Sequence, residues 1–173
     1  LPFVFGLLAA ALVCGIVALL IGIPTLRLGE DYLAIATLGI AETIRLFFNN
    51  EKWLANGARG LTGLPQPLQG IVEPRNYNYI YLIIVLLILV VVYLLIERAI
   101  RSLWGRVLRA VREDEVSAAM SGKDIFSFKM QSLVFGSMVM GAAGALFAHY
   151  NKAVSPDIFT PLYGTFIIWV MLI

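Results

Sequence analysis

The apolar run from Ile80 to Ile96 limits the possible folds of this chain more than any other feature. It holds fifteen Leu, Ile or Val residues and no charged side chain. At the centre of a membrane helix each such residue favours insertion by about 0.3 to 0.6 kcal/mol, so the run enters lipid readily. A helix in the core of a soluble protein has no need of such a sequence. The run therefore predicts a membrane protein.

The composition of the whole chain agrees with this prediction. Hydrophobic residues make up 60% and charged residues only 14%, whereas an ordinary soluble domain has about 25% charged residues. The net charge of +2 is small, and its distribution says more than its sum. We expect membrane lipid to surround the chain and no nucleic acid to bind it.

Apolar segments along the chain predict an all-α fold, a polytopic transmembrane helical bundle. We expect one transmembrane domain over residues 1–173, with spans at residues 2–26, 32–48, 79–96, 130–150 and a truncated one from 164. The first and fourth spans carry small residues at every fourth position, which lets a neighbouring helix approach closely. The third is bulky and aliphatic all round, so lipid should surround much of it. The second is the least hydrophobic.

Both ends of the sequence suggest that it is part of a longer chain. It begins with Leu1, and the apolar run after Gly164 stops too soon to cross about 30 Å of hydrocarbon. The opening apolar run lacks the basic start and the cleavage site of a signal peptide, so we count it as structure. The lone Cys14 excludes an internal disulfide and a thiolate metal cluster.

Half of the charged side chains lie in residues 97–129, and 7 of these 12 are basic. Basic loops resist translocation, so this segment should face the cytoplasm. Alternation then places residues 27–31 inside and residues 49–77 and 151–163 outside. The orientation depends on this difference in basic residues, because residues 49–77 carry only 3.

The charged segment itself predicts two helices. Apolar residues recur at helical spacing from Ile100 to Val111, with arginines on other faces, which predicts an amphipathic helix continuing from the third span along the membrane surface. The acidic residues that follow suit a helix N-terminus, and Gly122 suits a C-terminal cap. Residues 114–121 should therefore form a short helix exposed to the cytosol, a shape that another protein can bind.

Three long stretches carry a resemblance to a known family. They are GIPTLRLGEDYLAIATLGIAETIR at residues 22–45, GRVLRAVREDEVSAAMSGKD at 105–124, and GAAGALFAHY with SPDIFT at 141–150 and 155–160. In this order they resemble the inner-membrane permeases of branched-chain amino acid ABC importers, the LivM-like group. The resemblance implies an ABC importer permease fold and a multi-pass protein of the cell inner (plasma) membrane. Urea and short-amide permeases share the same patterns, so that substrate class stays open.

The resemblance also implies partners and a coupling site. In such permeases the loop that matches residues 112–124 is a coupling helix, which docks on the ATP-hydrolysing subunit. It assigns ATPase coupling to Arg112, Glu113, Asp114, Glu115, Ala118, Ala119 and Gly122. The alternative is an ordinary connector that returns the chain to the bilayer. The implied partners are ATP-binding ABC subunits, a second related permease, an extracytoplasmic solute-binding protein and an amino-acid substrate.

Polar residues in the second span are candidates for the transport path. They are Thr37, Gly39, Glu42, Thr43 and Arg45. Glu42 and Arg45 are three residues apart, so they can pair on one helix face. An ionisable group in a span is a functional candidate because its exposure to lipid would cost several kcal/mol. The alternatives are that both charges lie near the outer membrane surface, and that the hydroxyls make helix–helix hydrogen bonds.

Two other classes of protein fit the sequence less well. An ion-coupled secondary transporter would need a coupling site near mid-membrane, and the fourth span offers none. An intramembrane enzyme would need paired catalytic groups, but the only histidine, His149, has no second histidine or paired carboxylate nearby and is expected at the membrane interface. No phosphate loop is present, so ATP should be bound by a partner and no cofactor by this chain. The sequence predicts a permease subunit and not an enzyme.

Overall fold

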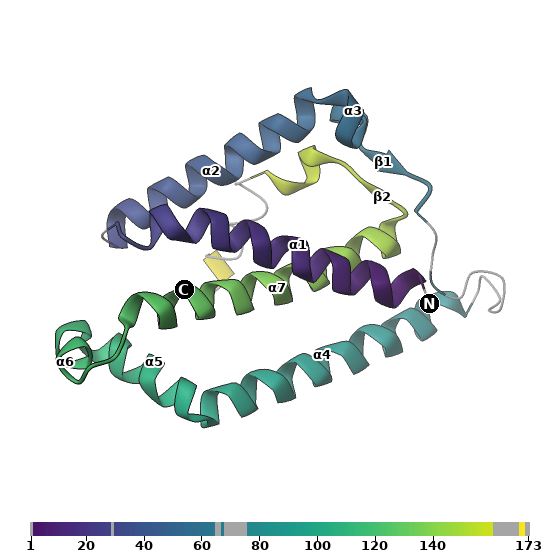
Figure 1. The fold of residues 1–173 in the computed structure, drawn as a ribbon. Coiled ribbons are helices and arrows are strands. Elements are labelled where there is room, and N and C mark those ends of the chain that lie inside the picture. Colours follow the sequence, from purple (N-terminus) through teal and green to yellow (C-terminus); the bar gives the residue numbers. More distant parts are fainter. Residues whose placement is uncertain (1, 29, 65–66, 68–75, 161–169, 172–173) are drawn as a thin grey trace. The chain divides into compact units, whose positions relative to one another are not determined.

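The computed structural model describes residues 2–28, 30–64, 67, 76–160 and 170–171 (Figure 1). Its helices are α1 (Pro2–Thr25), α2 (Glu30–Asn50), α3 (Lys52–Ala55), α4 (Tyr77–Arg101), α5 (Leu103–Glu113), α6 (Glu115–Met120) and α7 (Ile125–Asn151). Two 3₁₀ turns, Gly57–Arg59 and Pro156–Phe159, and two short strands, β1 (Leu61–Thr62) and β2 (Ala153–Val154), complete the described part. The predicted all-α fold is confirmed.

Three of the described helices are long and apolar enough to cross a bilayer: Phe3–Thr25, Tyr77–Arg101 and Ile125–Asn151. They correspond to the first, third and fourth predicted spans, and the first is shorter than predicted, since α1 ends at Thr25. Helix α2 contains the second, residues 32–48, but is not among the three, because polar and charged residues interrupt its apolar sequence. Its membrane crossing stays a prediction. The truncated span predicted from residue 164 has its start outside the described residues.

The chain divides into two compact units. Unit 1 comprises Leu1–Arg27 and Leu68–Leu146, and unit 2 comprises Leu28–Pro67 and Phe147–Ile173. Helix α7 contributes to both, since the division falls between Leu146 and Phe147.

In unit 1, small residues allow α1 and α7 to pack closely. A Cβ atom at Gly141 would lie 2.7 Å from the Sγ atom of Cys14 and 2.8 Å from the carbonyl oxygen of Ala10, so only glycine fits there. This is the close approach that the small residues of both helices predict. Helix α4 joins α7 through Tyr81, whose hydroxyl donates a hydrogen bond of 2.6 Å to the carbonyl oxygen of Leu146.

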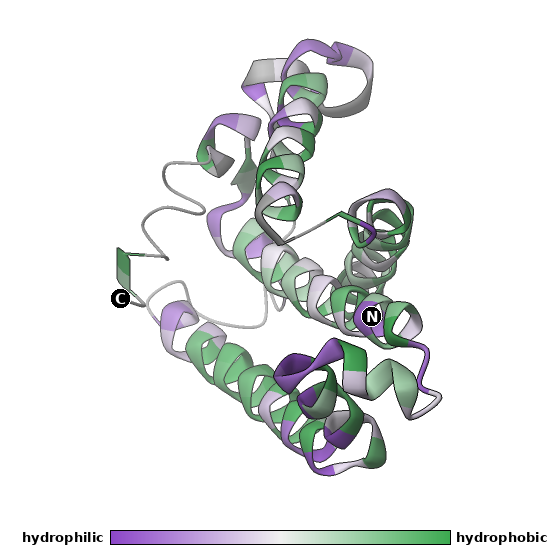
Figure 2. Ribbon diagram, turned by 90° about the vertical axis from the view of Figure 1, so that its left-hand side faces the viewer, coloured by the Kyte–Doolittle hydropathy of each residue, from purple (hydrophilic) through white to green (hydrophobic). Residues whose placement is uncertain are grey.

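Most apolar side chains of unit 1 lie on its outside. Few of the described side chains are buried, and exposed aliphatic residues run along α1 and α4. Figure 2 colours these long helices mainly green, the hydrophobic end of its scale. Such a surface is suited to lipid and not to water.

The amphipathic helix α5 is separated from α4, although the sequence predicts that it continues from the third span. Ser102 has an extended backbone (φ −74°, ψ 174°) between the two helices. The sharp bend brings Gly105 so close to Ile100 that a Cβ atom at residue 105 would overlap the Ile100 backbone. We call the bend at residues 100–105 the elbow.

Unit 2 holds α2, α3, β1 and the segment after α7. Strand β1 pairs antiparallel with β2, with Leu61 opposite Val154 and Thr62 opposite Ala153. Gly60 has a positive φ of 67°, and a Cβ atom there would overlap the Val154 carbonyl. Part of the predicted loop at residues 49–77 thus has regular structure, because its hydrogen-bonding partners come from a distant part of the chain. The two paired segments are those that the predicted topology places on the same, outer side.

Candidate coupling and transport sites

The short helix predicted at residues 114–121 is present as α6, and a side chain caps its N-terminus. Asp114 is the N-cap residue with extended backbone, and its Oδ1 atom accepts a hydrogen bond of 2.9 Å from the N–H of Val116. The hydroxyl of Ser117 donates to the other carboxylate oxygen at 2.5 Å. These bonds, above all the one from Ser117, hold the pKa of Asp114 below its ordinary value.

The C-terminus of α6 is closed by a Schellman motif. Gly122 adopts a φ of 75°, which glycine tolerates best. Its N–H donates to the carbonyl oxygen of Ala119 at 2.9 Å, and the N–H of Lys123 donates to that of Ala118 at 3.4 Å. Both ends of the helix are therefore defined by residues within the helix and directly beside it.

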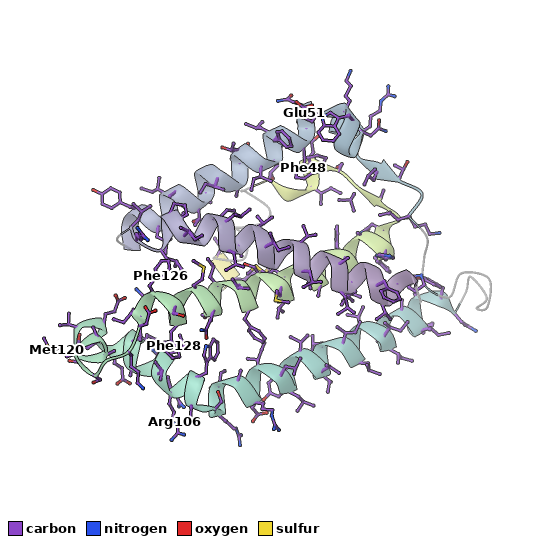
Figure 3. All side chains as sticks on the ribbon, in the orientation of Figure 1. Phe48, Glu51, Arg106, Met120, Phe126 and Phe128 are labelled. Carbon is purple, nitrogen blue, oxygen red and sulfur yellow. The ribbon has the colours of Figure 1, made fainter. Side chains whose placement is uncertain are left out.

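Helix α6 exposes a small apolar stripe. Val116 and Met120, four residues apart, are 63% and 84% exposed, and Figure 3 shows Met120 at the outer side of the helix. Ala118 is only 6% exposed, whereas Ala119 is exposed. A partner that touches α6 would thus meet Val116, Ala119 and Met120, not Ala118. Val116 and Met120 were not predicted as contact residues, although their i, i+4 spacing places them on one face of the helix.

Contacts within unit 1 tie α6 to the helices beside it. Lys129, in the second turn of α7, forms an ion pair with Glu115. Arg112 and Glu113, in the last turn of α5, are exposed. Residues 112–124, which we call the coupling segment, therefore form a capped projection between α5 and α7.

The predicted pairing of Glu42 with Arg45 is present in unit 2, and a third residue joins it. The Nε and Nη2 atoms of Arg45 donate to the two carboxylate oxygens of Glu42 at 2.9 and 2.6 Å. The Nη1 atom donates to Asp157 at 3.3 Å. The Arg45 side chain is 18% exposed, so two carboxylates compensate a largely covered guanidinium group. Asp157 was not predicted as a partner of Arg45, because it lies 112 positions away in the sequence.

An apolar pocket of about 540 Å³ lies beside this cluster, and we call it the α2 pocket. It is lined by Ala41, Ile44, Arg45, Phe48, Leu61, Val154, Ser155 and Pro156. Phe48 is labelled in Figure 3, on α2. The volume falls in the range of about 300 to 1,000 Å³ that is usual for small-molecule sites. Its walls suit an aliphatic group, and Arg45, the charged residue among these described lining residues, is already paired.

The five path candidates do not share one face of α2. A helix advances by 100° per residue, so Thr37 lies one turn before Ala41, on the side of the α2 pocket. Gly39 and Thr43 lie on the opposite side. The hydroxyl of Thr43 donates to the carbonyl oxygen of Gly39 at 2.8 Å, and that of Thr37 donates to the carbonyl oxygen of Leu33 at 2.9 Å. Both hydroxyls thus donate within the helix and not to a neighbouring helix.

Metal binding has no support in the described part of the chain. No group of three or more His, Cys, Asp or Glu side chains there has the arrangement needed to hold an ion. Cys14, the cysteine on α1, is a free thiol packed against Gly141.

Comparisons with known proteins agree with these features. The family model described as branched-chain amino acid transport system / permease component matches residues 1–173. A probable branched-chain amino acid transport permease protein LivM of Methanocaldococcus jannaschii is 28% identical over 98% of this chain and 49% of its own length. The high-affinity branched-chain amino acid transport system permease protein LivM of Salmonella typhimurium is 31% identical over 95% of this chain and 44% of its own. The protein of the same name from Escherichia coli is 31% identical over 97% of this chain and 44% of its own length.

The chain spans about half the length of the curated relatives it matches. No solved structure matches it.

Proposed function

Since this chain belongs to the branched-chain amino acid transport permease family, we propose that it forms part of the membrane-spanning permease subunit of an ATP-driven importer. The relatives are named as transport permease proteins and not as enzymes. Together with three apolar helices, they identify a multi-pass protein of the inner membrane. The substrate we propose is a branched-chain or related hydrophobic amino acid.

The observation that carries the proposal is the capped helix α6 with its exposed apolar stripe. Energy from a cytosolic ATPase can reach membrane helices only through a protruding contact that holds its shape. Asp114 and Gly122 define the ends of α6, and Glu115 attaches it to α7. Among the residues to which the resemblance assigns ATPase coupling, we expect Ala119 to touch the ATPase, beside Val116 and Met120. Ala118 has a packing role.

Arg112 and Glu113 contribute differently to this docking site. Both are exposed at the end of α5, next to the N-cap of α6. Exposed charges at the rim of an interface mainly steer association and choose the partner, whereas apolar residues at its centre contribute most of the affinity. We therefore assign recognition to these two charges and affinity to Val116 and Met120.

The proposed complex contains further subunits. They are ATP-binding ABC subunits, a second related permease and an extracytoplasmic solute-binding protein. The family description of a transport system with a permease component supports this view. The solute-binding protein would deliver the amino acid on the outer side, where the predicted topology places β1 and β2.

We place the transport path along α2. The α2 pocket offers an apolar wall for an aliphatic side chain, and Glu42 and Arg45 lie at its edge. Thr37 extends the same face by one turn. Gly39 and Thr43 face the other way, and within the described residues a Cβ atom at Gly39 would meet nothing within 4 Å. We propose that this second face lines the path next to another helix.

Urea or a short amide is the alternative substrate class. Such a solute needs several hydrogen-bonding groups at once, because a buried polar group without a partner is costly. The α2 pocket is walled mainly by apolar side chains, and three of the five N–H donors of Arg45 are already used by Glu42 and Asp157. The pocket therefore favours an aliphatic amino acid. Reconstitution of the whole importer with its binding protein tests this choice: leucine, isoleucine or valine should stimulate ATP hydrolysis, and stimulation by urea alone would contradict it.

The docking assignment is tested by two matched substitutions. Met120→Ala combined with Val116→Ala should lower co-purification of the ATPase about tenfold, because a combined loss of about 1.4 kcal/mol from two apolar interface contacts changes affinity by that factor. Met140→Ala is the matched control, because Met140 is 75% exposed on α7 and has no place in α6. Equal co-purification of both variants would remove the docking assignment.

A further inference from the structure

A cluster of arginines surrounds the elbow, and of these only Arg112 has a role in the proposed coupling. Residues 97–112 contain five arginines and one acidic residue, Glu97. Among the described residues, the side chains of Arg98, Arg106 and Arg112 have no ion-pair partner. So large an excess of one charge in a short segment requires counter-ions or an anionic partner.

The arginine side of α5 is the side that unit 1 leaves uncovered. The opposite, apolar side packs on α7: the indole N–H of Trp104 donates to the amide oxygen of Gln131 at 2.9 Å, and its ring lies 6.3 Å from that of Phe135. Val111 on the same side is 4% exposed. Figure 3 shows Arg106 pointing away from α7. The helix thus uses its apolar side for packing and presents its basic side outwards.

At the elbow the protein surface is hollowed. An open cavity of about 710 Å³ is lined by Leu94, Glu97, Arg98, Arg101 and Ser102. Arg101 donates to Glu97 at 2.5 Å across one helical turn, which leaves further donors of its guanidinium group available. The walls therefore combine two guanidinium groups with one carboxylate.

Arg109 stabilises the bend next to this hollow. Arg109 donates from Nη2 to the carbonyl oxygen of Ile100 at 3.3 Å and from Nε to that of Gly105 at 3.4 Å. The Ile100 carbonyl belongs to the last turn of α4, so the arginine charge also compensates the negative end of that helix. Gly105 allows the close approach that makes the bend.

The hollow continues directly into an apolar surface. Leu94 and Leu95 are 57% and 54% exposed, and Leu87, Val90 and Val91 continue the exposed aliphatic surface along α4. A ligand that fits both parts has a negative head beside Arg98 and Arg101 and a hydrocarbon tail along α4. A free phosphate ion or an acidic peptide would use only the first part.

We propose that the elbow binds an anionic phospholipid of the cytoplasmic leaflet, with its phosphate group at Arg98 and Arg101 and an acyl chain against Leu94. The planar guanidinium group suits phosphate oxygens, because two N–H groups can donate in parallel. Basic clusters directly cytoplasmic of a membrane helix attract anionic lipids by about 1 kcal/mol for each Lys or Arg near the surface. The inference rests on the cytoplasmic orientation in the proposed function.

The experiment compares retained lipids on the purified, complete importer. Native mass spectrometry should find phosphatidylglycerol retained in preference to phosphatidylcholine. Arg98→Gln combined with Arg101→Gln should lower phosphatidylglycerol retention roughly tenfold, since each arginine near the surface contributes about a fivefold factor and Arg101 is shared with Glu97. Arg59→Gln is the matched control, because Arg59 is an exposed arginine of unit 2. Inorganic phosphate should not displace the lipid.

Equal retention by the double variant and the parent would overturn the proposal, and so would displacement of the lipid by inorganic phosphate. A measurement on the unaltered protein tests the proposal even if the variant does not fold. Retention of phosphatidylglycerol should fall as the salt concentration is raised, because screening weakens exposed charge interactions. Retention independent of salt would also contradict the proposal.

In the proposed function the ATPase binds through Val116 and Met120, so the double arginine variant should still co-purify with the ATPase. Loss of lipid binding and loss of coupling are thus separate results.

Discussion

The coupling segment and the α2 pocket are built in opposite ways. The hydrogen bonds that cap the two ends of α6 join residues close in sequence, from Asp114 to Lys123. The α2 pocket exists only because β1 meets β2 and Arg45 meets Asp157, 112 positions away. A helix with local caps keeps its shape while the rest of the protein moves. A pocket made from distant segments changes when those segments move, which suits a path that opens and closes.

The largest effect is expected at the elbow, because its geometry leaves no room for a side chain. Gly105→Ala would place a Cβ atom into the backbone of Ile100. We expect a loss of about 3 kcal/mol or more in stability, as for other substitutions that force backbone overlap. The thermal unfolding midpoint of the purified protein and co-purification of the ATPase should both fall.

Gly136→Ala is the control for this substitution. A Cβ atom at Gly136 on α7 meets nothing within 4 Å among the described residues, and alanine is the better helix former. Its stability should equal or slightly exceed that of the parent. If Gly105→Ala behaved in the same way, the bend would not depend on glycine.

The next effect concerns the α2 pocket. Glu42→Gln removes the charge-assisted pairing with Arg45, so uptake should fall roughly tenfold, because hydrogen bonds between charged groups are stronger than neutral ones. Co-purification of the ATPase should be unchanged, since α6 keeps its own caps. Asp157→Asn should lower uptake less, because Asp157 makes one longer bond. Normal uptake by Glu42→Gln would give this pair a structural role.

Asp114 gives the coupling segment a pH dependence of known sign. Its folded-state pKa is lowered, first by the hydrogen bond from Ser117, so its contribution is present above the ordinary carboxyl pKa of about 3.9 and is lost as the pH falls through the folded-state value. At neutral pH, Asp114→Ala should therefore speed amide exchange at Val116. The difference from the parent should vanish in strong acid. Equal exchange at neutral pH would show that the cap is not needed.

The smallest effect is expected at the contact between α4 and α7, which belongs neither to the coupling segment nor to the α2 pocket. Tyr81→Phe removes one hydrogen bond to the carbonyl oxygen of Leu146, and such bonds between membrane helices contribute about 0.6 kcal/mol on average. The unfolding midpoint should fall slightly, while uptake and ATPase co-purification should stay at parental levels. A large loss of uptake would mean that α4 and α7 also contribute to transport.

The difference between local contacts and contacts between distant segments also explains how far the sequence could predict the structure. The apolar runs predicted α1, α4 and α7, and the order of acidic residues, small residues and Gly122 predicted α6, because these signals act within one or two helical turns. The bend at Ser102 was missed because it depends on a close approach at Gly105. Asp157 and the pairing of β1 with β2 were missed because nothing local marks contacts between distant segments. The exposure of Val116 and Met120 depends on which side of α6 packs inwards.

Thiol labelling of α6 tests the central claim most directly. Cys14→Ser would remove the cysteine of this sequence, and Met120→Cys would place one at the exposed side of α6. In intact cells the new thiol should resist reagents that cannot cross the membrane, and after cells are opened it should react unless the ATPase is bound. Labelling from outside the intact cell would contradict the account, because a helix on that side cannot receive force from a cytosolic ATPase.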